Sequence, residues 1–236
     1  MNYMGRLAEL WERIPEQLPE RIKERGYMVS VNQEKKDILI TGINPSFRER
    51  QDCTGHYAFD FRKDILENPK GDRYWTPLKR MLCSGEIDLR PQAAYLDLFC
   101  HRDKEQSSLR KEILSCDGGV AFIAEQLNIA QHVIEEIVVP KIIVVSNREA
   151  AAYLGKLAER GCIWMGYKLK HIEDLSCGEL YQVEGLLESE ERIALEIKES
   201  NLKGSLILFS SYACYTPKEK RPTAEKLQEL LTQCPM

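Results

Sequence analysis

Four apolar segments of the sequence end in polar or conformationally special residues, and these residues have types that could support binding or catalysis. The first segment ends in a Gly-Ile-Asn-Pro-Ser turn at residues 42–46, and the second contains Asp97. The third ends at residues 146–147 and the fourth at residues 210–212. The carboxyl ends of parallel strands meet at the crevice where α/β proteins bind ligands. We therefore expect these residues to share one site.

Each of these residues also has a purely structural interpretation. Gly42 and Pro45 can form a tight turn, and Asn44 can cap its own backbone. The segment CHRDKEQ favours a solvated loop position for His101. Asp97 is harder to explain in this way. A carboxylate in an apolar strand costs free energy unless it is paired, lies at a strand end or belongs to a site.

The spacing of the apolar segments predicts an α/β fold. The segments are nearly continuous rather than alternating, which is typical of strands buried on both faces. The predicted strands are residues 37–42, 93–100, 141–147 and 205–211. The predicted helices are residues 74–82, 118–139 with Asp117 as cap, 148–157 with Asn147 as cap, and a last helix from near Pro222. This alternation predicts a three-layer α/β/α sandwich with a central four-stranded, mostly parallel sheet.

The whole chain, residues 1–236, is expected to form a single domain with two additions. Residues 5–25 have helical spacing of apolar side chains and predict an N-terminal helix, interrupted or kinked near Pro15 and Pro19. Residues 161–204 break the strand and helix rhythm with patterns of short strands or hairpins, although RIALEIKES also fits a turn or two of helix. We interpret this region as an insertion before the last core strand.

Composition narrows the classes of protein that fit. The net charge of −4 argues against a surface built throughout to neutralise phosphates. Eight cysteines are scattered singly, which supports neither a zinc site nor a disulfide framework and favours a reducing compartment. The sequence shows no apolar leader, no membrane-spanning run and no phosphate-binding glycine motif. We expect a cytoplasmic monomer without metal, cofactor or membrane partner.

The segment ILITGINPS, residues 38–46, resembles the first motif of the uracil-DNA glycosylase superfamily. It is most similar to the Gly-Ile-Asn-Pro turn of the mismatch-specific (G:T/U) branch. The order of the following elements is also similar: YWTPLKRML, then YLDLF, then KIIVVSNREAAAYLG. The resemblance extends over roughly residues 37–155 and the last strand. It implies the glycosylase fold and a flipped nucleobase in DNA as the ligand.

The resemblance also implies roles for individual residues. Asn44 would orient the water that attacks the N-glycosidic bond, and Asp97 lies where the family has a base-recognising residue. The backbone of the turn would line the base pocket, and an aromatic side chain would stack on the base. The substrate-binding candidates are Gly42, Ile43, Pro45, Ser46, Phe47, Tyr57, Phe59, Ser210, Ser211 and Tyr212. Such a site needs a positioned water, a stabilised leaving base and an extruded nucleotide.

The chain departs from the family after the fourth strand. The second family motif is a His-Pro-Ser or Asn-Pro-Ser turn with an intercalating loop, whereas this chain has FSSYACYTPKEKRP. Ser210, Ser211 or Tyr212 could replace part of that motif. Basic residues near both loops are interleaved with acidic ones, so a DNA footprint and a mixed solvated surface both fit. The alternatives are a non-catalytic member of the fold that binds a nucleobase, nucleotide or protein, and an unrelated small-molecule α/β enzyme.

Overall fold

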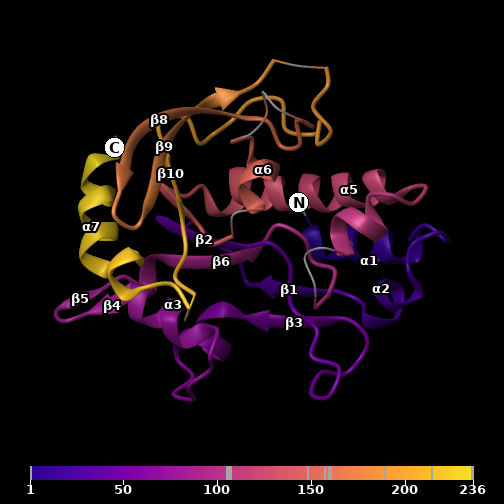
Figure 1. Cartoon of the computed structure of the whole chain (residues 1–236), viewed down its shortest axis with the longest axis horizontal. Helices are drawn as coiled ribbons and strands as arrows, with labels where there is room; N and C mark the ends of the chain where they lie inside the picture. Colours follow the sequence, from indigo (N-terminus) through magenta and orange to yellow (C-terminus); the bar gives the residue numbers. More distant parts are fainter. Residues whose placement is uncertain are drawn as a thin grey trace.

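A six-stranded sheet forms the centre of the molecule (Figure 1). The computed structural model describes residues 2–104, 108–147, 149–156, 158, 161–188, 190–213 and 215–234. The strand order across the sheet is β6-β2-β7-β10-β9-β8. These strands are β2 (Ile38–Gly42), β6 (Ala93–Asp97), β7 (Ile142–Val145), β8 (Tyr167–Leu175), β9 (Gly178–Leu186) and β10 (Leu206–Ser210).

The four apolar segments predicted as strands form four adjacent parallel strands. β2 lies between β6 and β7 and is parallel to both, and β10 is parallel to β7. The predicted number of strands in the sheet is wrong, because residues 161–204 supply two more. β8 and β9 form an antiparallel hairpin, and β9 pairs with β10. The hairpin thereby covers an edge of the parallel strands that would otherwise expose unpaired backbone groups.

Helices pack on both faces of the parallel strands. Successive residues of β2 alternate between two hydrophobic clusters, because side chains along a strand point to opposite faces. Leu39 belongs to the cluster formed with α1, α5 and α6, and Ile38 and Ile40 belong to the cluster formed with α3 and α7. Figure 1 shows α5 and α6 on one side of the sheet. The helices are α1 (Tyr3–Glu12), α2 (Glu20–Arg25), α3 (Trp75–Leu82), α5 (Gly119–His132), α6 (Ala150–Leu154) and α7 (Ala224–Gln233).

Shorter elements complete the chain. β1 (Met28–Val31) and β3 (Tyr57–Asp60) form a parallel pair, and β4 (Cys83–Ser84) and β5 (Ile87–Asp88) form a small hairpin. Further turns of helix among the described residues are η1 (Phe61–Leu66), η2 (Arg90–Gln92), η3 (Leu109–Ile113), η4 (Val133–Val138) and η6 (Lys218–Lys220). The structure divides the predicted helix 5–25 into α1 and α2. Residues 13–19 are not helical, since Pro15 and Pro19 disfavour helical backbone before them.

The predicted helix starts have mixed outcomes. Asn147 lies before α6 rather than at its N-cap, which is Glu149, but its Oδ1 accepts the backbone N–H groups of Glu149 at 2.8 Å and Ala150 at 3.4 Å. Residues 148 and 157 of that predicted helix lie outside the described residues. The predicted Asp117 cap is wrong: α5 begins after Gly118, whose left-handed backbone makes the turn, with no side-chain cap.

Residues 190–204 contain neither helix nor strand. Arg192, the first residue of the RIALEIKES segment, is buried and donates to the carbonyl oxygens of Ala194 and Ile197. These bonds satisfy backbone acceptors that a strand or helix would otherwise satisfy. The segment is therefore an ordered loop that follows the β8-β9 hairpin.

Candidate functional site

The carboxyl ends of the four parallel strands lie in register at one edge of the sheet. Thr41 of β2 pairs with Val145 of β7, which in turn pairs with Phe209 of β10. Gly42 is the partner of Asp97 in β6. The Gly-Ile-Asn-Pro-Ser turn, Asp97 and the serines after β10 thus follow the strands at the same edge.

Asp97 and Tyr95 form a hydrogen-bonded pair beside Gly42. The Tyr95 hydroxyl donates to Asp97 Oδ1 at 2.8 Å, since residues two apart in a strand share a face. A Cβ atom at position 42 would lie 2.1 Å from Asp97 Oδ1 and 2.7 Å from the Tyr95 hydroxyl. Only glycine leaves room for this pair.

The Asp97 carboxyl titrates in an unusual range. Loss of hydration raises the pKa of Asp97 to about 7, and the hydrogen bond from Tyr95 opposes this shift. Within the described residues no lysine, arginine or histidine forms an ion pair with Asp97. A carboxyl group with a pKa near neutrality can act as a general acid, as a general base or as a hydrogen-bond donor.

Two further tyrosines extend the pair into a cluster. The Tyr74 hydroxyl lies 2.9 Å from the Tyr95 hydroxyl, and the Tyr212 hydroxyl donates to Tyr74 at 3.4 Å. Tyr74 is 45% exposed, yet burial of its hydroxyl region, followed by the charge of Asp97, raises its pKa to about 12. Burial also raises the pKa values of Tyr95 and Tyr212 well above 10, so all three hydroxyls keep their protons at neutral pH.

Tyr212 is among the predicted binding residues, whereas Tyr74 and Tyr95 are not. One signal for Tyr95 was present, because it precedes Asp97 by two residues in a predicted strand. Tyr74 had no such signal, since it reaches the site only through the packing of α3 on the sheet.

Aromatic side chains surround Tyr95 on the same face of the sheet. The ring centroids of Phe59, Phe61 and Trp75 lie 6.3, 5.5 and 4.9 Å from that of Tyr95. Phe61 is buried, whereas Phe59 and Trp75 are only partly buried. Phe59 is therefore the one of the three predicted stacking residues that lies next to the Asp97 cluster.

The Asn44 side chain holds the turn against the loop that follows β6. Its Nδ2 donates to the carbonyl oxygens of Pro45 at 3.1 Å, Asp103 at 3.3 Å and His101 at 3.5 Å. These contacts orient the amide, and its Oδ1 accepts no hydrogen bond from any described residue. Asn44 thus combines a structural role with a free acceptor that could hold a water molecule.

Phe47 and Tyr57 belong to a separate cluster with two arginines. Phe47 is buried, and the guanidinium carbons of Arg25 and Arg102 lie 4.8 and 4.9 Å from its ring centroid. Arg102 also lies 4.7 Å from the Tyr57 ring centroid. The ring of Phe47 is used for packing and for cation–π contacts, which leaves it little surface for a base.

The other predicted site residues mainly shape their loops. Ser210 Oγ donates to the carbonyl oxygen of Cys177 in the hairpin turn, and Ser211 Oγ lies 2.7 Å from Thr216 Oγ1. Ile43 and Pro45 are buried, whereas Ser46 is exposed. These residues fix the conformation of the loops at the carboxyl edge of the sheet. Among them, Ser46 is exposed to solvent.

The solvated loop position predicted for His101 is wrong. His101 is buried, and desolvation lowers its pKa to about 4, so the imidazole is neutral. Gln126 Oε1 accepts the backbone N–H groups of Cys100 and His101 and lies 3.2 Å from His101 Nδ1. His101 therefore fastens the loop after β6 to α5.

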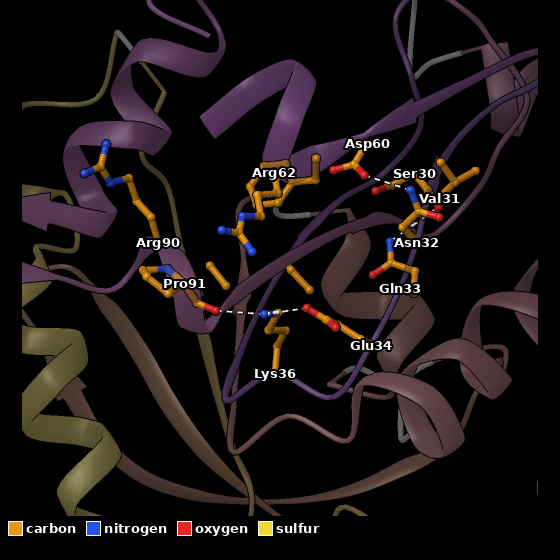
Figure 2. Close-up of a pocket in the computed structure, with 13 residues that line it drawn as sticks. Ser30, Val31, Asn32, Gln33, Glu34, Lys36, Asp60, Arg62, Arg90 and Pro91 are labelled. Carbon is orange, nitrogen blue, oxygen red and sulfur yellow. Dashed lines mark hydrogen bonds and ion pairs between the residues drawn. The ribbon is translucent and has the colours of Figure 1, made fainter. Parts of the chain in front are cut away.

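A small hollow lies at the opposite, amino-terminal end of β2 and β6 (Figure 2). Its volume is about 40 Å³, and Figure 2 shows Lys36 between the Pro91 carbonyl and the Glu34 carboxylate. Arg62 and Arg90 on its rim pair with Glu67 and Asp88. Because its cations already have carboxylate partners, this hollow is a weaker candidate than the Asp97 cluster.

Gly42→Ala is expected to lower the free energy of unfolding by about 1–3 kcal/mol, because the added methyl group overlaps Asp97 and Tyr95. Gly71→Ala is the matched control, since the nearest atom to its added Cβ is Thr76 Oγ1 at 3.7 Å. Urea unfolding of both variants measures the difference. Equal stability of Gly42→Ala and wild type would contradict the close packing at this edge.

No protein-family model matches this chain, and no curated protein matches it. The fold and the site define a mixed α/β protein with an acidic and tyrosine-rich cluster at the carboxyl edge of its parallel strands. Among the described residues, no helix combines the length and apolar character needed to cross a bilayer. The same residues contain no group of three or more His, Cys, Asp or Glu side chains that could hold a metal ion.

Proposed function

We propose that this protein is a DNA base-excision glycosylase-like enzyme that binds a flipped uracil or mismatched base and cleaves its N-glycosidic bond. The observation that supports this proposal most is that Gly42 of β2 pairs with Asp97 of β6 at the carboxyl edge of the parallel strands. The turn that resembles the glycosylase motif and the Asp97 carboxyl lie at the same edge of the sheet, which supports a shared site. The proposal includes the finer fold assignment, an α/β/α sandwich of four parallel strands to which the hairpin is added.

The residues would divide the chemistry among them. Asn44 would hold the attacking water through Oδ1, since its Nδ2 is anchored on three carbonyl oxygens. Asp97 would contact the base, and Phe59 would stack on it. Water adds to the sugar carbon as the bond to the base breaks. The bonding electrons leave with the base, and the proton that the water releases ends on the departing base. Positioned polar groups stabilise such a charge-separated transition state.

The loop after β10 offers a contact for DNA. Tyr215 is 85% exposed, and Lys218 and Lys220 are exposed a few residues further on. An exposed aromatic ring beside cations suits stacking between bases together with phosphate contacts. This arrangement supports a local DNA-binding surface on a protein whose net charge is negative.

Tyr215→Ala is expected to weaken binding of uracil-containing duplex DNA by about 1–3 kcal/mol, because one stacking contact is lost. Fluorescence anisotropy with a labelled duplex measures the affinity. Ile172→Ala is the control, since Ile172 is exposed on the β8-β9 hairpin. Wild-type affinity should also fall steeply with salt, because neutralised phosphates release counterions. Unchanged affinity in Tyr215→Ala would remove this loop from the DNA interface.

The decisive experiment is a panel of labelled duplexes that contain uracil, mismatched thymine, hypoxanthine or an oxidised base. Abasic-site formation by the wild-type protein on at least one duplex, together with its loss in Asp97→Ala, would support the proposal. A purified protein that yields no abasic sites on any duplex would refute the glycosylase activity.

A non-catalytic function of the same site is the second candidate. The observation that favours it is the use of Asn44 Nδ2 for three backbone contacts, which a purely structural turn residue would also make. In that case none of the duplexes yields abasic sites, while a free nucleobase or nucleotide still binds to the protein. Equilibrium dialysis with labelled uracil distinguishes this outcome from a protein that lacks a nucleobase site altogether.

A further inference from the structure

Three tyrosine hydroxyls and the Asp97 carboxyl form one continuous hydrogen-bonded chain. The steps are 3.4 Å from Tyr212 to Tyr74, 2.9 Å from Tyr74 to Tyr95 and 2.8 Å from Tyr95 to Asp97 Oδ1. An ionised carboxylate can only accept, and each phenol has a single proton to donate. The chain therefore has one direction, in which every hydroxyl donates toward Asp97.

The chain connects elements that are distant in the sequence. Tyr95 lies in β6, Tyr74 precedes α3, and Tyr212 follows β10, which is three strands away from β6 in the sheet. Ser146, which follows β7, donates its hydroxyl to the carbonyl oxygen of Thr41 at 3.0 Å. Its proximity lowers the pKa values of Tyr74 and Tyr212 and partly offsets the effect of burial. The chain thus spans the whole carboxyl edge of the four parallel strands.

This arrangement leaves the two carboxyl oxygens of Asp97 in different states. Oδ1 accepts the Tyr95 hydroxyl and lies against the Cα atom of Gly42. Oδ2 has no hydrogen-bond partner among the described residues. The titratable groups near Asp97 are the three tyrosines and the Cys100 thiol, and no cation of the described chain pairs with it. A proton on this carboxyl would reside on Oδ2, the oxygen that Tyr95 does not occupy.

We propose that Tyr95, Tyr74 and Tyr212 are positioning residues that hold Asp97 with Oδ1 occupied and Oδ2 presented to the ligand. The ligand class is a heterocyclic base with a hydrogen-bond acceptor, either a carbonyl oxygen or an unprotonated ring nitrogen. The protonated carboxyl donates to this acceptor through Oδ2. This inference rests on the proposed function, because it assigns the recognition of the base to one oxygen of Asp97.

The ionisation of Asp97 provides a direct readout of the positioning role. The hydrogen bond from Tyr95 favours the ionised carboxylate and opposes the effect of burial on the pKa. Removal of that hydroxyl should therefore raise the pKa of Asp97 further above its ordinary value. Removal of the Tyr74 hydroxyl should have the same sign and a smaller size, because Tyr74 acts on Asp97 through Tyr95.

The test is a carbon NMR titration of the full chain labelled at the aspartate carboxyl carbons, with the Asp97 signal assigned by its absence in Asp97→Asn. Tyr95→Phe is expected to raise the titration midpoint by about 1 pH unit and Tyr74→Phe by less. Tyr153→Phe is the control, since Tyr153 is buried on the opposite face of the sheet, in the hydrophobic cluster formed with α1, α5 and α6, beside Phe99 and Trp164. An unchanged midpoint in a folded Tyr95→Phe would overturn the positioning role. If Tyr95→Phe does not fold, an unchanged midpoint in Tyr74→Phe overturns it.

A binding experiment with free uracil as the probe tests the contact through Oδ2. Trp75 fluorescence reports on this site, because its ring centroid is 4.9 Å from that of Tyr95. Uracil affinity should decrease about tenfold per pH unit above the titration midpoint of Asp97. Tyr95→Phe should raise the pH at which this decrease begins. Uracil binding that is independent of pH would overturn the donated hydrogen bond. Abasic-site formation together with an unchanged midpoint in Tyr95→Phe would overturn the inference and leave the proposed function standing.

Discussion

Asp97→Asn is expected to raise the free energy of unfolding at pH 8 by about 2–4 kcal/mol. The reason is that the folded protein binds the Asp97 proton more tightly than the unfolded chain does, since the pKa rises from 3.8 to about 7 on folding. A tenfold change in proton affinity corresponds to about 1.4 kcal/mol, and the partial exposure of the residue reduces the effect on stability. Asparagine carries no charge at any pH and keeps an oxygen that can accept the Tyr95 hydroxyl.

The pH dependence of this effect has a definite sign. The favourable contribution of protonated Asp97 is complete below the unfolded pKa of about 3.8 and is lost as the pH rises toward 7. Wild type and Asp97→Asn should therefore have similar stability near pH 3.5 and differ most above pH 7. Guanidinium unfolding at a series of pH values measures both curves.

Asp103→Asn is the matched control and should have the opposite effect. Burial alone would raise the pKa of Asp103, but hydrogen bonds from Ser108 and the Lys104 amide, with Arg21 and Arg25 nearby, lower it overall. Arg25 Nη1 lies 2.7 Å from Asp103 Oδ1, and both side chains are largely buried. Breaking this pair should cost about 3 kcal/mol at pH 7. Destabilisation by Asp97→Asn at pH 8 would contradict the raised pKa and the site built on it.

A stabilising substitution at Asp97 would have a functional meaning. Residues that serve binding or catalysis often lower the stability of the fold, because their charge or strain is not compensated by the surrounding structure. The combination of increased stability and lost abasic-site formation in one variant would therefore support a chemical role for this carboxyl. Increased stability with full activity would assign the base contact to another residue.

Asn44→Ala is expected to lower turnover on a verified substrate by about 100- to 1000-fold, because the water would lose its positioned acceptor. It should also lower the free energy of unfolding by about 1–3 kcal/mol, since the carbonyl oxygens of Pro45, His101 and Asp103 lose a donor. Single-turnover kinetics and urea unfolding separate the two effects. Substrate affinity should change little, because the lost contact matters chiefly in the transition state.

Asn68→Ala is the control for this substitution. Asn68 is exposed and makes local hydrogen bonds to the carbonyl oxygen of Asp64 and from the amide of Lys70. Its loss should change stability by about 0.5 kcal/mol or less and leave turnover intact. An Asn44→Ala protein that is destabilised but retains its specific activity would make Asn44 a structural turn residue, and the water would need another holder.

The parallel strands could be predicted because strands buried on both faces have nearly continuous apolar sequences. A strand such as IIVV at residues 142–145 has no polar position, which only a sheet covered on both faces tolerates. The sequence pattern of the β8-β9 hairpin is less informative. Its residues predict a strand pair, but which sheet edge it joins depends on the open edge of β10, a feature that exists only after the core has formed.

The stacking candidates show where local pattern is insufficient. Phe47, Tyr57 and Phe59 are similar aromatic residues in one loop region of the sequence. Arg25 and Arg102, which lie far apart in the sequence, approach the Phe47 ring, while Phe59 lies beside Tyr95. The difference among the three rings therefore arises from neighbours that no spacing rule identifies.

The strands, the glycine turn and the candidacy of Asp97 could be inferred from the residues alone, because they follow from local periodicity and from the free-energy cost of a carboxylate in an apolar segment. The predicted strand extends to residue 100, whereas β6 ends at Asp97. The surroundings of that carboxyl depend instead on how distant segments pack. Tyr74 and Tyr212 are 138 residues apart, and their hydroxyls meet because α3 and the end of β10 pack on the same face of the sheet. Hydration and hydrogen bonding act over a few ångströms in space, so the raised pKa of Asp97 is a property of the folded neighbourhood.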